Sequence, residues 1–224
     1  LSTAMMYAFA ARGDCAVWDE PFYAPYLAAT RADHPMAAEI MAAHETDPAR
    51  VAARCAGPVP EGLAHFYMKH MPHHMVAGFP LDWAEDCVNV HLIRHPARVI
   101  ASYAEKRGEM TLEDIGFPQQ LALWERLPGP VIDSADIRAD PGGALRRLCA
   151  EIGLGFSDTM LGWPEGPRAY DGIWAAHWYN AVHRSTGFAG AEGPLPEVPE
   201  GRRALLEAAL PIYEAMTARA LRPD

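Results

Sequence analysis

Two polar residues, Arg94 and Ser102, lie eight positions apart across a predicted strand-to-helix turn. The apolar run 87–93 predicts a buried strand that ends directly before Arg94. Pro96 is expected at the first position of the following helix, where its missing N–H has no consequence. A guanidinium at a strand end, a helix N-terminus and a hydroxyl within that helix together suit a phosphate group. The alternative is an ordinary strand-to-helix turn with an Arg at the surface.

Two further polar residues, Glu20 and Lys69, lie at or just after the end of a predicted strand. Short apolar strands alternate with helical segments along the chain, which predicts a parallel sheet covered by helices on both faces. Ligands on such sheets bind at the carboxyl ends of the strands. We therefore expect an α/β fold with a central parallel sheet, in which Glu20, Lys69 and Arg94 each lie at a strand end.

The expected elements follow from apolar periodicity and from turn signals. Strands are predicted at 15–19, 64–69, 88–94 and 130–133. Helices are predicted at 2–11, at 34–56 with a break at Pro48, from the turn after Arg94 to about Arg107, at 117–127, at 142–152, and from about Pro199 with a kink at Pro211. The Gly-, Pro- and Trp-rich stretch 162–193 predicts a long functional loop. The length predicts a single domain, 1–224.

The segment 93–103 resembles the part of sulfotransferases in which an Arg and a Ser, eight residues apart, hold the 3'-phosphate of 3'-phosphoadenosine 5'-phosphosulfate (PAPS). The resemblance extends to the segment 136–141, where Asp140 is predicted to cap an amphipathic helix; the Glu that family members often carry just before this segment is replaced by Ala. The resemblance implies a P-loop-type nucleotide-binding fold, as in bacterial members of the family. It also implies that Arg94 and Ser102 bind PAPS, whose sulfuryl group is transferred to a hydroxyl or amine of a small-molecule acceptor.

Ser2 and Thr3 lie where the phosphosulfate loop of that family meets its helix. Hydroxyls and free N–H groups at a helix N-terminus can bind a sulfuryl or phosphate oxygen, and plain N-capping is the alternative. The resemblance implies that both residues bind the nucleotide, and that a first strand and its loop precede Leu1. Because Leu1 precedes Ser2, this helix start lacks the Lys-Ser/Thr pair of an ordinary nucleotide kinase.

The segment 68–72 resembles the Lys-containing segment of the family. The resemblance implies that Lys69 binds the phosphosulfate and neutralises the leaving oxygen. Some members carry a catalytic His two residues after this Lys, whereas this chain carries Met71 there and has His70 one residue earlier. His70 is therefore a catalytic candidate that departs from the family pattern.

The segment 19–23 resembles heparan-type sulfotransferases, in which a Glu followed by paired aromatic residues acts as general base. The resemblance implies this role for Glu20, and a solvated acidic turn is the alternative. The late segment 168–188 resembles the family loop that closes over the adenine nucleotide, so Arg168 and Trp174 are implied as nucleotide-binding residues. Its aromatic residues fit a core or an acceptor pocket equally well.

The composition limits the partners of the chain. A net charge of −10 argues against nonspecific nucleic-acid binding, which needs a basic face. No apolar run is long enough to span a membrane, and four widely spaced cysteines are typical of reduced thiols in a cytoplasmic protein. His70, His73 and His74 lack a completing Cys or carboxylate pattern, so no metal is expected. A homodimer is compatible with the sequence.

Two other functions remain compatible with these patterns. One is an atypical P-loop kinase or phosphohydrolase, and the other is a non-catalytic nucleotide-binding protein on the same scaffold. Magnesium-dependent turnover of ATP would favour the first. Tight binding of the desulfated nucleotide without turnover would favour the second.

Overall fold

The computed structural model describes residues 1–104 and 110–222. The chain divides into two compact units, and each is described by itself. The first unit comprises Leu1–Cys87 and Ser157–Ala189, and the second comprises Val88–Phe156 and Gly190–Asp224. The expectation of one domain over 1–224 stays a prediction.

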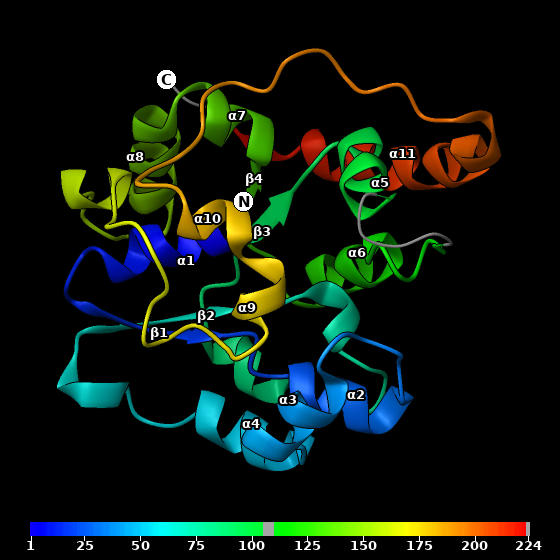
Figure 1. Ribbon diagram of the computed structural model, residues 1–224. Helices are drawn as coiled ribbons and strands as arrows, with labels where there is room; N and C mark the ends of the chain where they lie inside the picture. Colours follow the sequence, from blue (N-terminus) through cyan, green and yellow to red (C-terminus); the bar gives the residue numbers. More distant parts are fainter. Residues whose placement is uncertain (105–109, 223–224) are drawn as a thin grey trace. The chain divides into compact units, whose positions relative to one another are not determined.

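Two parallel strands, β1 (Cys15–Asp19) and β2 (His65–Lys69), form the sheet of the first unit. Their register pairs Cys15 with His65 and Asp19 with Lys69. Helix α1 (Ser2–Ala10) lies on one side of this pair and α4 (Pro48–Cys55) on the other, as Figure 1 shows. The alternation of side chains along a strand explains this layering, because successive residues point to opposite faces.

The two faces of this sheet carry different apolar contacts. On one face, Phe9 of α1 stacks on Tyr67 of β2, with 4.5 Å between ring centroids. On the other face, Trp18 and Met68 pack against a cluster that includes Val51 of α4. The carboxyl ends of β1 and β2 are thereby held between two packed layers.

A second cluster in this unit joins segments that are far apart in the sequence. It is formed by α2 (Tyr23–Thr30), α3 (Ala37–Ala43) and α9 (Ala175–Trp178), together with the two residues that flank α9. The second of these, Tyr179, directly precedes α10 (Asn180–His183). Its buried members are Tyr23, Ala24, Leu27, Ile40, Trp174, Ala175 and Tyr179. The late aromatic segment is therefore packed into the core beside the end of β1.

The second unit is built on a parallel sheet with the order β3 (His91–Ile93), β4 (Val131–Asp133), β5 (Ala220–Leu221). Its helices are α5 (Pro96–Ala104), α6 (Phe117–Arg126), α7 (Ser134–Ala139), α8 (Pro141–Glu151) and α11 (Arg203–Thr217). Asp140 caps α8, as predicted, by accepting a hydrogen bond of 2.9 Å from the Gly143 N–H. Pro96 is the first residue of α5, also as predicted.

The predicted α/β class with parallel strands and flanking helices is confirmed, and the described strands form these two sheets. Some boundaries differ from the predictions. The third strand begins at His91 rather than at Val88, which is 65% exposed and therefore does not belong to a buried strand. The helical stretch predicted at 34–56 begins at Ala37, and its predicted break at Pro48 is confirmed, because Asp47 caps a second helix that begins there.

The stretch predicted as a long loop, 162–193, contains the short helices α9 and α10. The predicted end of the helix after Arg94, near Arg107, lies outside the described residues. Pro211 lies within α11, which continues through it.

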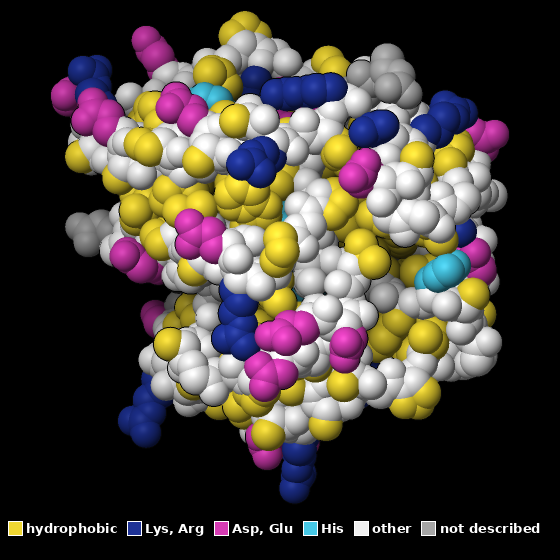
Figure 2. All heavy atoms as spheres, turned by 180° about the vertical axis from the view of Figure 1, so that it is seen from behind, with side chains coloured by type: hydrophobic (Ala, Val, Ile, Leu, Met, Phe, Trp, Pro, Cys, Tyr) yellow, Lys and Arg dark blue, Asp and Glu magenta, His cyan; other side chains and the backbone are white. Residues whose placement is uncertain are grey.

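Acidic and basic side chains are interspersed over the face of the molecule drawn in Figure 2. Among the described residues, no helix is long and apolar enough to cross a membrane.

Candidate active site

Lys69, the last residue of β2, is buried among acidic and phenolic oxygens in the first unit. Its Nζ donates hydrogen bonds to Oδ1 of Asp19 at 3.1 Å and to the hydroxyl of Tyr179 at 2.7 Å. It also contacts Oε1 of Glu20 directly. A buried ammonium is stable only when its donors are satisfied and opposite charge is close, and all three donors have partners here.

Asp19 links this network to the late part of the chain. Its two carboxylate oxygens each lie 2.8 Å from the hydroxyl of Tyr179, and Oδ2 accepts a hydrogen bond of 3.1 Å from the backbone N–H of Gly172. A Cβ on Gly172 would lie 2.1 Å from the ring of Trp174, so only glycine fits there. Because Gly172 has no Cβ, its backbone can lie against the Trp174 ring while its N–H bonds to the Asp19 carboxylate.

The charges in this network shift one another. Burial raises the pKa of Glu20 above its ordinary value, although the neighbouring Lys69 charge opposes the rise. Burial also disfavours the charged form of Lys69, but Glu20 and Asp19 outweigh it and hold the Lys69 pKa well above its usual value. Lys69 therefore remains an ammonium, and Glu20 becomes a stronger base than an exposed glutamate.

Glu20 follows β1 with an unusual backbone conformation. Its φ is +42°, in the left-handed region that residues other than glycine rarely adopt. Its N–H donates to the Lys69 carbonyl at 2.9 Å, which extends the strand pairing by one residue before the chain turns into α2. The strained turn places two consecutive carboxylates, Asp19 and Glu20, around one ammonium. Strained residues of this kind concentrate at functional sites.

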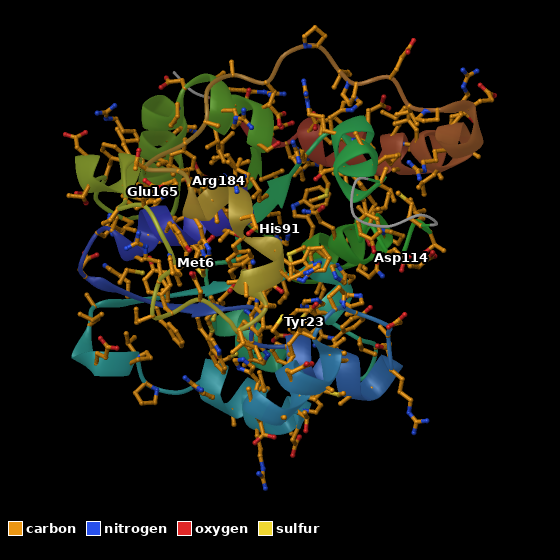
Figure 3. All side chains as sticks on the ribbon, viewed as in Figure 1. Met6, Tyr23, His91, Asp114, Glu165 and Arg184 are labelled. Carbon is orange, nitrogen blue, oxygen red and sulfur yellow. The ribbon has the colours of Figure 1, made fainter. Side chains whose placement is uncertain are left out.

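An imidazole, that of His74, approaches Glu20 from the one-turn helix Pro72–His74. Its Nδ1 lies 3.8 Å from Oε2 of Glu20 and has no hydrogen-bond partner among the described residues. The His74 ring stacks on Tyr23, labelled in Figure 3, and on Tyr26, with centroid distances of 4.4 and 4.9 Å. Burial and the neighbouring cationic and imidazole groups hold the pKa of His74 well below its usual value, so it is neutral.

His70 has a different environment. Its ring lies 5.4 Å from that of Trp83 and 5.9 Å from that of Phe22, and burial lowers its pKa to about 4. The catalytic role predicted for His70 stays a prediction. His74, which the sequence analysis considered only as a metal ligand, is the imidazole that the structure places beside Glu20.

A cavity of ≈ 280 Å³ in the first unit borders Glu20. Two tryptophans, Trp18 and Trp174, contribute to its lining together with His44, Arg50 and Arg54 of the α3–α4 region. Apolar walls with a few converging polar groups are typical of small-molecule sites. The cavity therefore lies next to Glu20, where a small molecule would be close to the charge network.

In the second unit, Arg94 follows β3 as predicted, and its guanidinium donates to Oε1 of Glu192 at 2.7 Å. Arg98, in the first turn of α5, places its Nε 2.9 Å from Oε2 of the same carboxylate. Ser102 lies in α5 four residues after Arg98, on the same side of the helix. The structure thus places the carboxylate of Glu192 against Arg94 and Arg98, and the phosphate-binding roles of Arg94 and Ser102 stay predictions.

Comparison with known proteins identifies the kind of domain. The model of a family described as "Sulfotransferase domain" matches residues 1–220. The chain belongs to this sulfotransferase family.

Two curated relatives from Arabidopsis thaliana resemble this sulfotransferase domain. They are branched-chain-amino-acid aminotransferase-like protein 2, 32% identical over 222 residues, and branched-chain-amino-acid aminotransferase-like protein 1, 33% identical over 222 residues. Each match covers 96% of this chain but only 39% and 40%, respectively, of the relative. The chain therefore spans about two fifths of the length of these relatives. No solved structure matches the chain.

The remaining predicted site residues of the sulfotransferase domain lie in the first unit. Ser2 and Thr3 are the first two residues of α1, whose N-cap is Leu1, and neither side chain makes a capping hydrogen bond. The guanidinium of Arg168 donates to the backbone carbonyl of Glu165, labelled in Figure 3, at 2.9 Å. Trp174 is buried in the core cluster and donates through Nε1 to the Tyr179 hydroxyl at 3.3 Å. Their nucleotide-binding roles stay predictions.

Sequence reasoning missed Tyr179, His74 and the role of Asp19. Tyr179 lies 110 residues from Lys69 along the chain, so no local spacing connects them. The pair Asp19-Glu20 at a strand end was a usable signal, because two adjacent carboxylates in a largely apolar segment need a cation. Within the described residues, no group of three or more His, Cys, Asp or Glu side chains could hold a metal ion.

Proposed function

We propose that this chain transfers a sulfuryl group from PAPS to a hydroxyl or amine of a small-molecule acceptor. The observation that carries the proposal is the buried contact between Lys69 and Glu20 beside the cavity. An ammonium and a carboxylate at one point supply the two groups that sulfuryl transfer requires, a cation for anionic oxygens and a base for a proton.

In this mechanism, Glu20 takes the proton of the acceptor hydroxyl or amine. The acceptor oxygen or nitrogen forms a bond to sulfur while the bond from sulfur to the bridging phosphate oxygen breaks, in line and on the opposite side. The raised pKa of Glu20 supports its role as base, because a base works best when its pKa approaches the working pH. Lys69 remains charged, and because its three donors are taken by Asp19, Glu20 and Tyr179, its contribution to the negative oxygens of the transition state comes through its charge and not through a direct hydrogen bond.

The cavity supports a small acceptor group. Its volume of ≈ 280 Å³ lies just below the range of about 300–1,000 Å³ for small-molecule pockets, so only a small acceptor group fits. Trp18 and Trp174 contribute aromatic surface to its lining, the Arg54 guanidinium lies over the Trp18 ring at 4.0 Å from the centroid, and Arg50 is paired with Glu45, which also lines the cavity. A compact acceptor with an apolar part and a hydroxyl or amine is compatible with this mixed lining of aromatic and charged residues.

We assign the 3'-phosphate of PAPS to the second unit, on the basis of the contacts that Arg94 makes within that unit. Arg94 already binds a carboxylate, which supports recognition of another oxyanion at the same place. We expect Arg94→Ala to weaken the binding of adenosine 3',5'-bisphosphate by about 1.5–3 kcal/mol, the range for a hydrogen bond to a charged group. Calorimetry with adenosine 5'-phosphosulfate, which lacks the 3'-phosphate, should show little change. Arg147→Ala, which removes an exposed partner of Glu151, is the matched control.

Turnover separates this proposal from its rivals. Formation of adenosine 3',5'-bisphosphate from PAPS, dependent on an added acceptor and retained in excess chelator, is the expected result. Magnesium-dependent turnover of ATP would indicate the kinase or phosphohydrolase instead. Binding of the bisphosphate with no turnover over a broad acceptor panel would indicate a non-catalytic binder.

A further inference from the structure

Three arginines of the second unit converge on one glutamate, Glu192. Arg94, after β3, donates to Oε1 at 2.7 Å, and Arg98 of α5 places Nε 2.9 Å from Oε2. Arg138 of α7 lies 3.7 Å from Oε1 through its Nη1. The Glu192 side chain is only 6% exposed, although both of its chain neighbours are exposed. The chain has thus buried a carboxylate from a surface segment against three cations.

The Glu192 carboxylate leaves some of the hydrogen-bonding groups around it without a partner. Oε2 of Glu192 has no hydrogen bond in suitable geometry among the described residues, despite its closeness to Arg98. Nε of Arg94 is shielded from solvent and has no partner there either. Among the described residues, the three arginines face one carboxylate, that of Glu192. A group with more oxygens and a second negative charge would satisfy more of these donors than a carboxylate does.

We propose that Arg94, Arg98 and Arg138 form a site for a phosphate monoester dianion, and that Glu192 is its built-in occupant, displaced when the phosphate binds. This inference rests on the proposed function, which supplies a nucleotide 3'-phosphate as the ligand. Beyond the proposed role of Arg94, it assigns phosphate binding to Arg98 and Arg138 and states that the phosphate takes the place of Glu192. Binding therefore requires the segment that carries Glu192 to leave the arginines.

The attachments of this segment are suited to exchange. Besides the carboxylate contacts, Arg138 donates to the carbonyl of Gly190 at 2.7 Å and Arg98 donates to the carbonyl of Gly193. The same arginines therefore hold both the side chain and the backbone of 190–193, and an incoming phosphate competes for all of these donors. Residues 189–199 form no helix or strand, so the release of 190–193 breaks no regular element. A tethered competitor acts at an effective concentration in the millimolar range, which lowers the apparent affinity for the ligand.

The test compares two nucleotides and two charge-matched variants by calorimetry. Glu192→Gln removes the competing charge, and Glu197→Gln removes an exposed charge from the same segment as the control. The probes are adenosine 3',5'-bisphosphate and adenosine 5'-phosphate. We expect Glu192→Gln to tighten binding of the bisphosphate by at least about fivefold, the low end of typical coupling between two ligands. The 5'-phosphate should bind wild type and both variants alike.

Each other result contradicts the exchange. Unchanged or weaker binding of the bisphosphate by Glu192→Gln, with a preference for the 3'-phosphate retained in the wild type, overturns the displacement of Glu192 and leaves the proposed function standing. Equal binding of the two nucleotides by the wild type overturns both. Glu192→Ala serves as the second variant if Glu192→Gln loses its thermal transition, and the same tightening is expected.

Discussion

Asp19 and Lys69 are register partners at the carboxyl ends of β1 and β2, and Oδ1 of Asp19 lies 3.1 Å from Nζ of Lys69. Partners in register project to the same face of a sheet, so strand pairing alone brings this carboxylate to the ammonium. Glu20 reaches the same ammonium from the residue after the strand. The charge network is therefore fixed by the backbone, and four predictions follow from its geometry and its surroundings.

Removal of the central cation should destabilise the fold. We expect Lys69→Met to lower the free energy of unfolding by about 3–5 kcal/mol, because Asp19 and Glu20 would remain buried without a cation. Urea unfolding measures the loss. The double variant Lys69→Met/Glu20→Gln should recover part of it. Arg50→Gln, which removes an exposed ion pair with Glu45, should cost less than about 1 kcal/mol. A similar small loss for Lys69→Met would contradict the interpretation.

Replacement of the proposed base should affect the reaction and spare the nucleotide. Glu20→Gln keeps the shape of the side chain and removes the base, so turnover should fall by a factor of about 10²–10⁴. Affinity for adenosine 3',5'-bisphosphate should stay within about twofold of the wild-type value. Steady-state rates with an accepted substrate and calorimetry provide the two readouts.

His70→Asn is the companion variant for this experiment. If it abolishes turnover while Glu20→Gln leaves the rate intact, the base is His70 and not Glu20. A third variant, His74→Phe, retains the ring that stacks on Tyr23 and Tyr26 but removes the nitrogen that faces Glu20. A change in the pH profile of turnover is expected for this variant, because the surroundings of the Glu20 carboxylate change.

The glycine that approaches Asp19 should not tolerate a side chain. A Cβ at position 172 would lie 2.1 Å from the buried ring of Trp174, so Gly172→Ala must displace that ring or the backbone. We expect a loss of about 1–3 kcal/mol in unfolding free energy, the usual range for overpacking. Gly201→Ala, where a Cβ has no neighbour within 4 Å, is the control. Equal melting temperatures for the two variants would show that the ring adapts freely.

Acid should weaken the fold through buried imidazoles. The pKa of His70 is about 4 in the folded chain against an ordinary value of 6.5, so between these values only the unfolded chain binds the proton. Stability should therefore fall as the pH drops from about 6.5 to about 4, with up to about 3 kcal/mol from this residue. His74 shifts in the same direction.

Urea unfolding at several pH values tests this expectation. His70→Phe keeps an aromatic ring beside Phe22 and Trp83 and should flatten the pH dependence. His177→Phe alters an exposed imidazole and is the control. A pH dependence unchanged by His70→Phe would refute the buried, neutral state of this residue.

Local signals predicted the elements that carry the site. Glu20, Lys69 and Arg94 lie where their apolar runs and following turns indicated, because strand ends and helix starts are determined by neighbouring residues. The partners of these residues could not be predicted this way. Glu192 lies 98 residues from Arg94, and only the folded chain brings them together.

At position 20, the left-handed backbone and the contact with Lys69 favour different residue types. Aspartate and asparagine adopt this conformation more readily than glutamate does, and glycine adopts it without strain. Yet aspartate is one methylene shorter and would withdraw its oxygens from Lys69, while asparagine and glycine carry no charge at all. The residue best suited to the chain path is thus not the residue best suited to the chemistry. A tolerance screen at position 20 should accordingly yield variants that turn over more slowly, and their stability should reflect two opposing effects, the relief of backbone strain and the loss of a partner for the buried Lys69.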